Sequence, residues 1–159
     1  MVYGIFDRNQ QDYYTYLSTV FEAIKDAQKN YNWLVTDYEC YPKSEDIENL
    51  LDREYCWFSG DELSQLVEKE DFQWIWGAFC GFEKDIPLSE ILKYPLPTIM
   101  DNNQYYKNPV SLQHPLSTVE ILPCDSSLLM IISKNKKIID DYISAFPKTE
   151  DLSEYNNKC

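Results

Sequence analysis

The amino-acid sequence predicts one α+β domain, a mixed or mainly antiparallel sheet of about five or six strands covered by helices. The chain has 159 residues, the usual length of one domain, and 44% of them are hydrophobic and 15% aromatic, which is enough for a packed core. Strand-like and helix-like segments alternate along the chain, and a hairpin pattern lies near its end. We assign the domain to residues 1–147 and expect residues 148–159, which carry no apolar stripe, to form a disordered tail.

The first third of the chain predicts two strands and two helices. Residues 2–6 are typical of a short strand, and the apolar residues that follow recur at spacings of three and four, which predicts an amphipathic helix over residues 11–29. Residues 32–41 are rich in aromatic and β-branched residues and stop at a proline, which favours a strand. Residues 44–51 predict a short helix whose first residue, a serine, is its N-cap.

The middle of the chain predicts a strand, a capped helix and a buried strand. Residues 55–58 favour a strand, and the Ser-Gly-Asp-Glu run that follows matches a capping box for a helix over residues 59–69. In residues 72–82 both alternating sets of side chains are apolar, which predicts the central strand of the sheet, buried on both faces. We expect Trp74 and Trp76 to share one face of this strand and to belong to the core.

The last part of the chain predicts a hairpin and a final helix. Residues 87–93 favour a short helix that ends before two prolines, and residues 101–115 favour an irregular loop. Residues 117–122 and 128–133 predict two strands joined by a turn. Residues 136–146 then predict an amphipathic helix, which the next proline ends.

Cysteine spacing and the absence of long apolar runs indicate the compartment. The five cysteines are an odd number, lie far apart and form no Cys-x-x-Cys pair or zinc-binding spacing, so we expect reduced thiols. The N-terminus lacks a basic region followed by an apolar one, and no apolar run approaches the roughly 20 residues that a bilayer needs. These features predict a cytoplasmic protein with no classical secretion signal and no membrane span.

The sequence offers no catalytic, metal-binding or cofactor-binding motif. It has no glycine-rich phosphate loop, no His-Glu-x-x-His and no nucleophile elbow, and it contains only four glycines. Its single histidine, His114, precedes a proline in the predicted loop, where we expect no chemistry. We therefore predict that the chain is not an enzyme and needs no cofactor.

Acidic residues dominate the chain and gather in one segment. The formal net charge is −13, which repels nucleic acid and anionic membranes and favours a basic partner. Residues 37–71 hold twelve acidic and three basic residues, and six aromatic residues lie among or beside them. Such a run is either a solvated face or a binding face with aromatic anchors. We take as candidate partner-binding residues Asp37, Glu39, Glu45, Asp46, Glu48, Asp52, Asp61 and Glu62.

Four segments carry a resemblance to known proteins: Tyr3-Gly-Ile-Phe, Tyr31-Asn-Trp-Leu-Val, Phe58-Ser-Gly-Asp-Glu-Leu and Asp125-Ser-Ser-Leu-Leu-Met-Ile-Ile-Ser-Lys. With them the chain resembles the small acidic immunity proteins of bacterial polymorphic-toxin and contact-dependent inhibition systems. It is also similar to an uncharacterised family of small proteins from low-GC Gram-positive bacteria. The first resemblance implies a protein that binds and neutralises a cognate basic toxin domain, such as a nuclease. The alternatives are an acidic regulator or DNA mimic that inhibits a nucleic-acid enzyme, and a small-ligand binder or enzyme.

Overall fold

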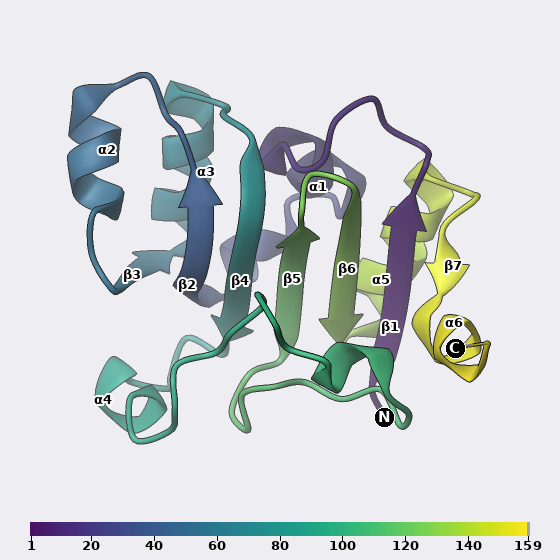
Figure 1. The fold of residues 1–159 in the computed structure, drawn as a ribbon. Coiled ribbons are helices and arrows are strands. Elements are labelled where there is room, and N and C mark those ends of the chain that lie inside the picture. Colours follow the sequence, from purple (N-terminus) through teal and green to yellow (C-terminus); the bar gives the residue numbers. More distant parts are fainter. Residues whose placement is uncertain (159) are drawn as a thin grey trace.

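The computed structural model describes residues 1–158, which form one sheet of seven antiparallel strands in the order β3-β2-β4-β5-β6-β1-β7 (Figure 1). The α+β class is confirmed, and the sheet has more strands than predicted. The strands are β1 (Tyr3–Arg8), β2 (Asn32–Cys40), β3 (Tyr55–Ser59), β4 (Trp74–Phe82), β5 (Val119–Cys124), β6 (Leu128–Ser133) and β7 (Glu150–Asp151). The predicted hairpin is present as β5 and β6.

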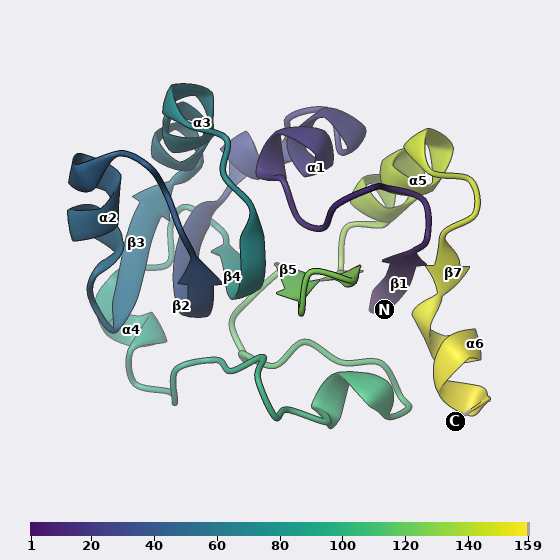
Figure 2. The same ribbon diagram turned by 45° about the horizontal axis from the view of Figure 1, so that its top comes forward.

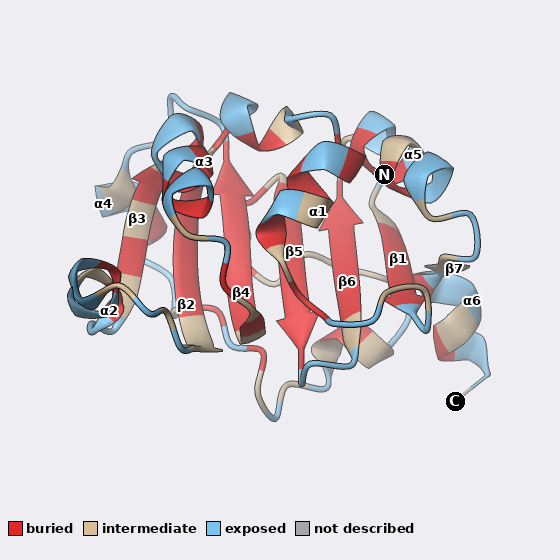
Figure 3. Ribbon diagram, turned by 90° about the horizontal axis from the view of Figure 1, so that it is seen from above, coloured by how far each residue is buried: buried red, intermediate tan, exposed pale blue. Residues whose placement is uncertain are grey.

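Three helices cover one face of the sheet, as Figure 2 shows: α1 (Leu17–Ala23), α3 (Gly60–Lys69) and α5 (Lys136–Ala145). Their apolar side chains pack in one cluster with sheet residues such as Trp33 and Ile131. In Figure 3 the strands in the middle of the sheet are coloured mostly as buried, while the outward sides of the helices are exposed. Among the helices of residues 1–158, none is both long and apolar enough to span a bilayer.

The other face of the sheet is covered mainly by loops and short helices. These are α4 (Leu88–Ile91), the 3-10 helix η2 (Gln104–Tyr106) and α6 (Leu152–Asn157), with the chain between α4 and β5 (Figure 2). Ile91 packs with strand residues near the β3 end of this face, and Tyr105 packs with others near the β1 end. Both faces of the sheet therefore lie in the interior.

Local signals in the sequence set several helix boundaries. Ser59 and Glu62 form the predicted capping box of α3, and Ser44 caps α2 (Glu45–Leu51) as predicted. The long helix predicted over residues 11–29 is wrong in its extent, because only α1 and the 3-10 helix η1 (Ala27–Asn30) are helical there. Lys25 and Asp26 lie between them with positive φ angles of 56° and 60°, which a continuous right-handed helix excludes.

Strand β4 is an interior strand, but its side chains do not alternate in the predicted way. Trp74 is buried in the cluster beneath the helices, whereas Trp76 and Ala78 pack in the cluster of the opposite face. The pairing of β4 with β2 is irregular at this point, where Asp37 of β2 has a positive φ angle of 49°. The expectation that Trp74 and Trp76 share one face is wrong, because this irregularity changes the alternation.

The prediction of a disordered tail is wrong for the described part of residues 148–159. Two of these residues form β7, which pairs with β1, and the Arg8 Nε atom lies 3.0 Å from a carboxylate oxygen of Glu150. Leu152 is 0% exposed, and the ring of Tyr155 stacks on that of Phe6 at 4.2 Å. The side chains of Leu152 and Tyr155 therefore pack this otherwise polar segment against the sheet. Cys159 lies outside the described residues.

Candidate functional site

The predicted acidic site lies at the β3 end of the sheet, where α2 follows β2 and α3 follows β3 (Figure 1). The Ser44 hydroxyl accepts a hydrogen bond from the backbone N–H of Ile47 and so starts α2. The Glu70 carboxylate accepts hydrogen bonds from the backbone N–H groups of Lys43 and Ser44, at 2.7 and 2.9 Å. These bonds lower the pKa of Glu70, and they hold the first turn of α2 beside the end of α3.

Seven of the eight predicted carboxylates lie in this region, and we call them the acidic edge: Glu39, Glu45, Asp46, Glu48, Asp52, Asp61 and Glu62. Glu39, Glu48 and Asp52 line a hollow of about 370 Å³ between β2 and α2. Asp46 and Glu62 line a second hollow, of about 450 Å³, between α2 and α3. Glu45 and Asp61 are exposed in the first turns of α2 and α3. The acidic edge therefore surrounds two concave surfaces.

Asp37, the eighth predicted residue, does not belong to the acidic edge. Its carboxylate accepts hydrogen bonds from the backbone N–H groups of Ile99 and Met100, at 2.7 and 2.9 Å. These two residues lie in the segment that covers the opposite face of the sheet. Asp37 therefore holds that segment against the irregular part of β2, which is a structural role that its charge alone did not reveal.

Glu62 has a structural role as well as a place in the acidic edge. Its Oε1 atom accepts a hydrogen bond from the backbone N–H of Ser59 at 2.8 Å, and the Ser59 hydroxyl accepts one from the Glu62 backbone N–H at 3.0 Å. Carboxylates in the first turn of a helix also interact favourably with the helix dipole, so part of the charge on α2 and α3 stabilises these helices. The other carboxylates of the acidic edge accept no hydrogen bond from a backbone N–H group in the described chain.

Six aromatic residues were expected to accompany the carboxylates as anchors: Trp33, Tyr38, Tyr41, Tyr55, Trp57 and Phe58. Trp33 and Phe58 are buried in the core, and the Trp33 Nε1–H donates to the Gln28 carbonyl. Tyr38 lines the hollow of Glu39, and its hydroxyl donates to the Leu51 carbonyl at 2.7 Å. Tyr41, at 73% exposure, is the only one of the six that projects strongly from the surface.

The negative charge of the acidic edge is not neutralised within the described molecule. Residues 1–158 form five ion pairs, and none of the five includes a residue of the segment 37–71. The segment does contain three basic residues, Lys43, Arg53 and Lys69, but they pair with none of its carboxylates within 4.0 Å. A cluster of like charges without internal partners leaves a strong local field at this end of the protein.

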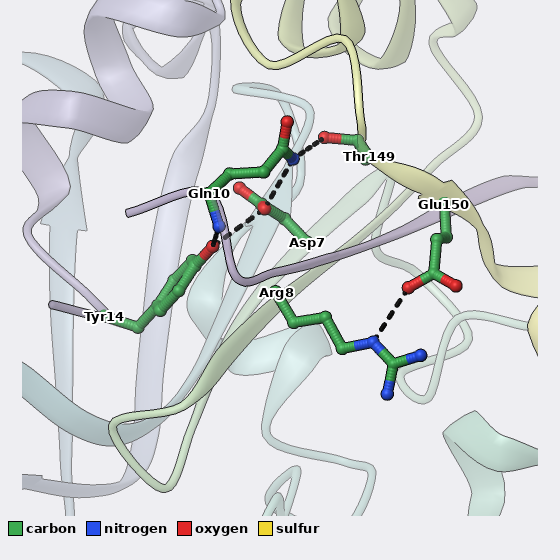
Figure 4. A network of polar contacts seen from close by, with 6 residues as sticks. All are labelled: Asp7, Arg8, Gln10, Tyr14, Thr149 and Glu150. Atoms are coloured by element: carbon green, nitrogen blue, oxygen red, sulfur yellow. Dashed lines mark hydrogen bonds and ion pairs between the residues drawn. The ribbon is translucent and has the colours of Figure 1, made fainter. Parts of the chain in front are cut away.

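Two buried carboxylates elsewhere have the features that often mark catalytic groups. The first, Asp7, is 0% exposed at the end of β1 and accepts hydrogen bonds from the hydroxyls of Tyr14 and Tyr142 and the amides of Gln10 and Gln11. Figure 4 shows its carboxylate between Gln10 and Tyr14. Burial raises the pKa of Tyr14 to about 12, with a smaller contribution from Asp7, so this hydroxyl stays protonated and donates. Four donors saturate the two oxygens, which indicates a structural network.

The second buried carboxylate, Glu120 on β5, is also 0% exposed and also has four donors. Its Oε1 atom accepts from the Tyr105 hydroxyl and the Gln113 backbone N–H, at 2.9 and 2.8 Å. Its Oε2 atom accepts from the His114 backbone N–H and the Ser117 hydroxyl, at 3.0 and 2.6 Å. Three of these four donors belong to residues 113–117, so Glu120 orders the loop before its own strand and has no oxygen lone pair left for a substrate.

We expect Glu120→Gln to lower the free energy of unfolding by about 1–3 kcal/mol, because the new amide NH₂ faces donors and leaves them unsatisfied. Urea unfolding followed by tryptophan fluorescence measures this change. Glu154→Gln is the matched control, since Glu154 is exposed on α6, and it should change the stability by less than about 0.5 kcal/mol. Equal stability of the two variants would contradict the structural role of Glu120.

His114 lies in a loop as predicted, but it is buried. Its Nδ1 atom accepts a hydrogen bond from the backbone N–H of Leu116 at 3.1 Å, which places the proton of the neutral ring on Nε2. The Nε2–H then donates to the Ile91 carbonyl at 3.0 Å and ties α4 to the loop. The nearby Ser117 hydroxyl donates to other groups, so the two residues form no nucleophile and base pair.

The cysteines of residues 1–158 are free thiols, as expected, and they are not arranged for chemistry. Burial raises the pKa of Cys40 and of Cys124 to about 12, so both thiols are protonated at neutral pH and poor nucleophiles. In the same part of the chain, no group of three His, Cys, Asp or Glu side chains is placed to hold a metal ion. The acidic edge is thus the best-supported candidate site.

Comparison with known proteins assigns the chain to a family. No curated protein and no solved structure is significantly similar to the chain. The model of a family described as a protein of unknown function, DUF2691, matches residues 3–95. The match extends from β1 through α4 and includes the whole acidic edge. Since it covers more than half of the 159 residues, the chain belongs to the DUF2691 family.

Proposed function

We propose that this protein holds a basic protein partner on the acidic edge and that it neutralises this partner, as an immunity protein neutralises a toxin domain. The observation that carries the proposal is the cluster of carboxylates on β2, α2 and α3 that have no cationic partner within the described chain. All of these carboxylates except the half-buried Glu39 are exposed in the free protein, and a basic surface would supply their missing cationic partners.

The shape and charge of the acidic edge suit long basic side chains. The hollow of about 370 Å³ has Glu39, Glu48 and Asp52 in its wall, so a lysine or arginine that enters it meets carboxylates on several sides. Tyr41 projects beside Glu39, and its hydroxyl donates to that carboxylate at 3.3 Å. An exposed aromatic ring next to a charged hollow is typical of residues that dominate binding energy at protein interfaces.

The narrower role of toxin neutralisation rests on the resemblance of four segments to immunity proteins. Three of these segments, which begin at Tyr3, Tyr31 and Phe58, lie in β1, β2 and the start of α3. The third contains Asp61 and Glu62 of the acidic edge. The proposed partner is therefore a basic domain, such as a nuclease, whose substrate-binding face carries positive charge.

Coexpression with a toxin domain encoded beside this protein tests the proposal directly. We expect the protein to restore growth of cells that express the toxin domain and to form a complex with it that survives size-exclusion chromatography. The variant with Tyr41→Ala should restore growth less well. Growth arrest that persists while the protein is abundant would contradict the immunity role. Competition with the partner's nucleic-acid substrate would show which face of the partner is covered.

Charge reversal in the hollow between β2 and α2 should slow association with the partner. For Glu39→Lys combined with Glu48→Lys and Asp52→Lys, we expect the association rate constant to fall by about tenfold or more, because exposed charges steer encounter. Its dependence on salt should become weaker. Stopped-flow or surface plasmon resonance measurements at several salt concentrations give both quantities.

The matched control reverses Asp12, Asp85 and Glu154, three exposed acidic residues outside the segment 37–71. Each triple variant changes the net charge from −13 by the same amount, so the comparison separates position from total charge. The control should keep most of the association rate. Equal losses in both variants would mean that only the total charge matters, and the assignment of the acidic edge would fail.

A further inference from the structure

The outer strand β3 has a neighbouring strand on one side only. The sheet ends with β3 at one side and with β7 at the other (Figure 1). Natural proteins protect outer strands by keeping them short or by placing a lysine, a proline or a bulge in them. β7 has only two residues, whereas β3 has five, Tyr-Cys-Trp-Phe-Ser, which pair regularly with β2. β3 thus lacks the usual protection against a further strand.

Hydrogen bonds show which backbone groups of β3 point outward. In an antiparallel pair, residues direct their N–H and C=O groups alternately to the partner strand and away from it. The Ser59 N–H points away from β2, because it donates to the Glu62 carboxylate at 2.8 Å. By alternation, the backbone groups of Tyr55 and Trp57 also point outward, while those of the residue between them point to β2.

The pairing on the other side of β2 gives the same alternation. The Gly81 carbonyl of β4 accepts from the Thr118 N–H at 2.8 Å, on the side of β5, and so points away from β2. Trp33 lies opposite Gly81 and therefore directs its backbone groups to β3. There it is paired with Phe58, whose backbone groups point to β2 in turn.

The outward positions of β3 are unoccupied by any group of residues 1–158. The backbone N–H and C=O groups of Tyr55 and of Trp57 form no hydrogen bond with a turn, a loop or a side chain of this part of the chain. Two backbone donors and two acceptors are thus left to water. A strand laid beside β3 can pair with all four.

The charge around β3 selects the chemistry of such a strand. Four exposed carboxylates flank β3, with Asp52 and Glu54 before it and Asp61 and Glu62 after it, and Arg53 is the one basic residue among them. A second copy of this chain would bring its own carboxylates against these, so the charge disfavours self-pairing. A strand with lysine or arginine near its ends is attracted instead.

We propose that an extended basic segment of the partner pairs with β3 as an additional strand of the sheet. This inference rests on the proposed function, since it describes how the same partner is held beside the acidic edge. The backbone hydrogen bonds supply binding that does not depend on side-chain identity, and the flanking carboxylates select basic residues.

Apolar side chains on both faces of β3 offer further contacts to the added strand. Tyr55 and Trp57 are half-buried against the cluster on the loop-covered face. Phe58 belongs to the cluster beneath the helices and lines the hollow of about 450 Å³ between α2 and α3. Alternate side chains of a neighbouring strand lie beside such residues, so apolar residues between the basic ends would stabilise the pairing.

A basic peptide tests the pairing without the partner. The probe is acetyl-Lys-Thr-Val-Thr-Val-Thr-Lys-amide, titrated into the ¹⁵N-labelled protein. In the free protein we expect the amide protons of Tyr55 and Trp57 to exchange with solvent faster than those of Cys56 and Phe58. The peptide should shift the first two signals in a saturable way and slow their exchange. Equal protection of all four amides in the free protein would overturn the proposal, because the outer side would already be covered.

Two altered peptides separate hydrogen bonding from charge. N-methyl groups on two adjacent central residues remove a donor from each side of the peptide strand, and glutamate in place of both lysines reverses the charge. Each change should weaken binding by about tenfold or more. Unchanged binding of the methylated peptide would show that backbone pairing is absent. Unchanged binding of the glutamate peptide would show that the occupant is not a basic segment. Either result overturns the proposal.

A pair of variants tests the same point on the protein. Tyr55→Pro removes an outward N–H at the first residue of β3, where proline is tolerated, and Tyr55→Ala removes the same ring but keeps the N–H. We expect the peptide and the partner to bind Tyr55→Pro about tenfold or more weakly than Tyr55→Ala. Equal binding would contradict the pairing. If Tyr55→Pro fails to fold, the methylated peptide makes the comparison on the unchanged protein.

The outcomes distinguish this inference from the proposed function. If the partner binds Tyr55→Pro and Tyr55→Ala equally well but binds weakly after reversal of Glu39, Glu48 and Asp52, the proposed function stands and the pairing is overturned. If the peptide pairs with β3 while no toxin domain is neutralised, the pairing stands and the proposed function fails. Dimers of the protein that Tyr55→Pro dissociates would identify a second copy as the occupant and overturn the basic segment.

Discussion

A chain truncated after Pro147 should lose about 5 kcal/mol of its free energy of unfolding, which is a third or more of the roughly 5–15 kcal/mol of an ordinary domain. The removed segment contains Leu152, whose side chain is completely buried beside Phe6, and Tyr155, whose ring stacks on Phe6. It also contains β7, which pairs with β1. Truncation therefore exposes one edge of the sheet together with part of Phe6, which this segment covers.

Urea unfolding monitored by circular dichroism measures the effect of this truncation. Removal of only the last two residues is the control, and it should leave the unfolding midpoint unchanged because Lys158 is exposed. Leu152→Ala isolates the largest contribution and should cost about 2–5 kcal/mol. An unchanged midpoint after truncation at Pro147 would show that the segment does not contribute to the fold, as its polar composition suggests.

Trp74→Ala should be the most destabilising single substitution in β4, at about 3–5 kcal/mol. Trp74 is 1% exposed and lies within 6 Å of three aromatic rings, those of Tyr38, Phe72 and Phe79. Its removal leaves a cavity that these rings are too constrained to fill. Urea unfolding measures this cost as a lower midpoint. The slope of the free energy of unfolding against urea concentration should stay unchanged.

Trp76→Ala is the natural comparison, because the same substitution occurs two residues away on the same strand. Trp76 is only half-buried, so we expect its replacement to cost about 1–2 kcal/mol. The sequence pattern placed both tryptophans on one face and made Trp76 as important as Trp74. Equal costs for the two variants would support that pattern and contradict the observed packing.

The elements that the sequence predicted well are those specified by nearby residues. The capping box of Ser59 and Glu62, the N-cap Ser44 and the turn between β5 and β6 each depend on groups a few residues apart. The elements that it predicted poorly depend on distant contacts. β7 pairs with the edge of β1, and the change of alternation in β4 occurs where its pairing with β2 is irregular, opposite Glu39 and Cys40.

The same distinction between what was and was not visible in the sequence applies to the candidate site. The density of charge between residues 37 and 71 was visible in the sequence, and seven of the eight chosen carboxylates do lie together. Which aromatic residues project from the surface was not visible in the sequence, since Trp33 is buried and Tyr41 is exposed although both are aromatic.

The position of the β5–β6 hairpin has a consequence for the boundaries of the folding unit. The segment that identifies the family, residues 3–95, contains β1 and β4, but the hairpin that separates these strands in the sheet comes later in the chain. Within that segment β1 has no strand to pair with, since its neighbours are β6 and β7. A fragment cut at residue 95 would thus leave β1 without strand partners and one edge of β4 unpaired. Expression plasmids and truncation series for relatives should extend beyond the family match until the missing hairpin is included.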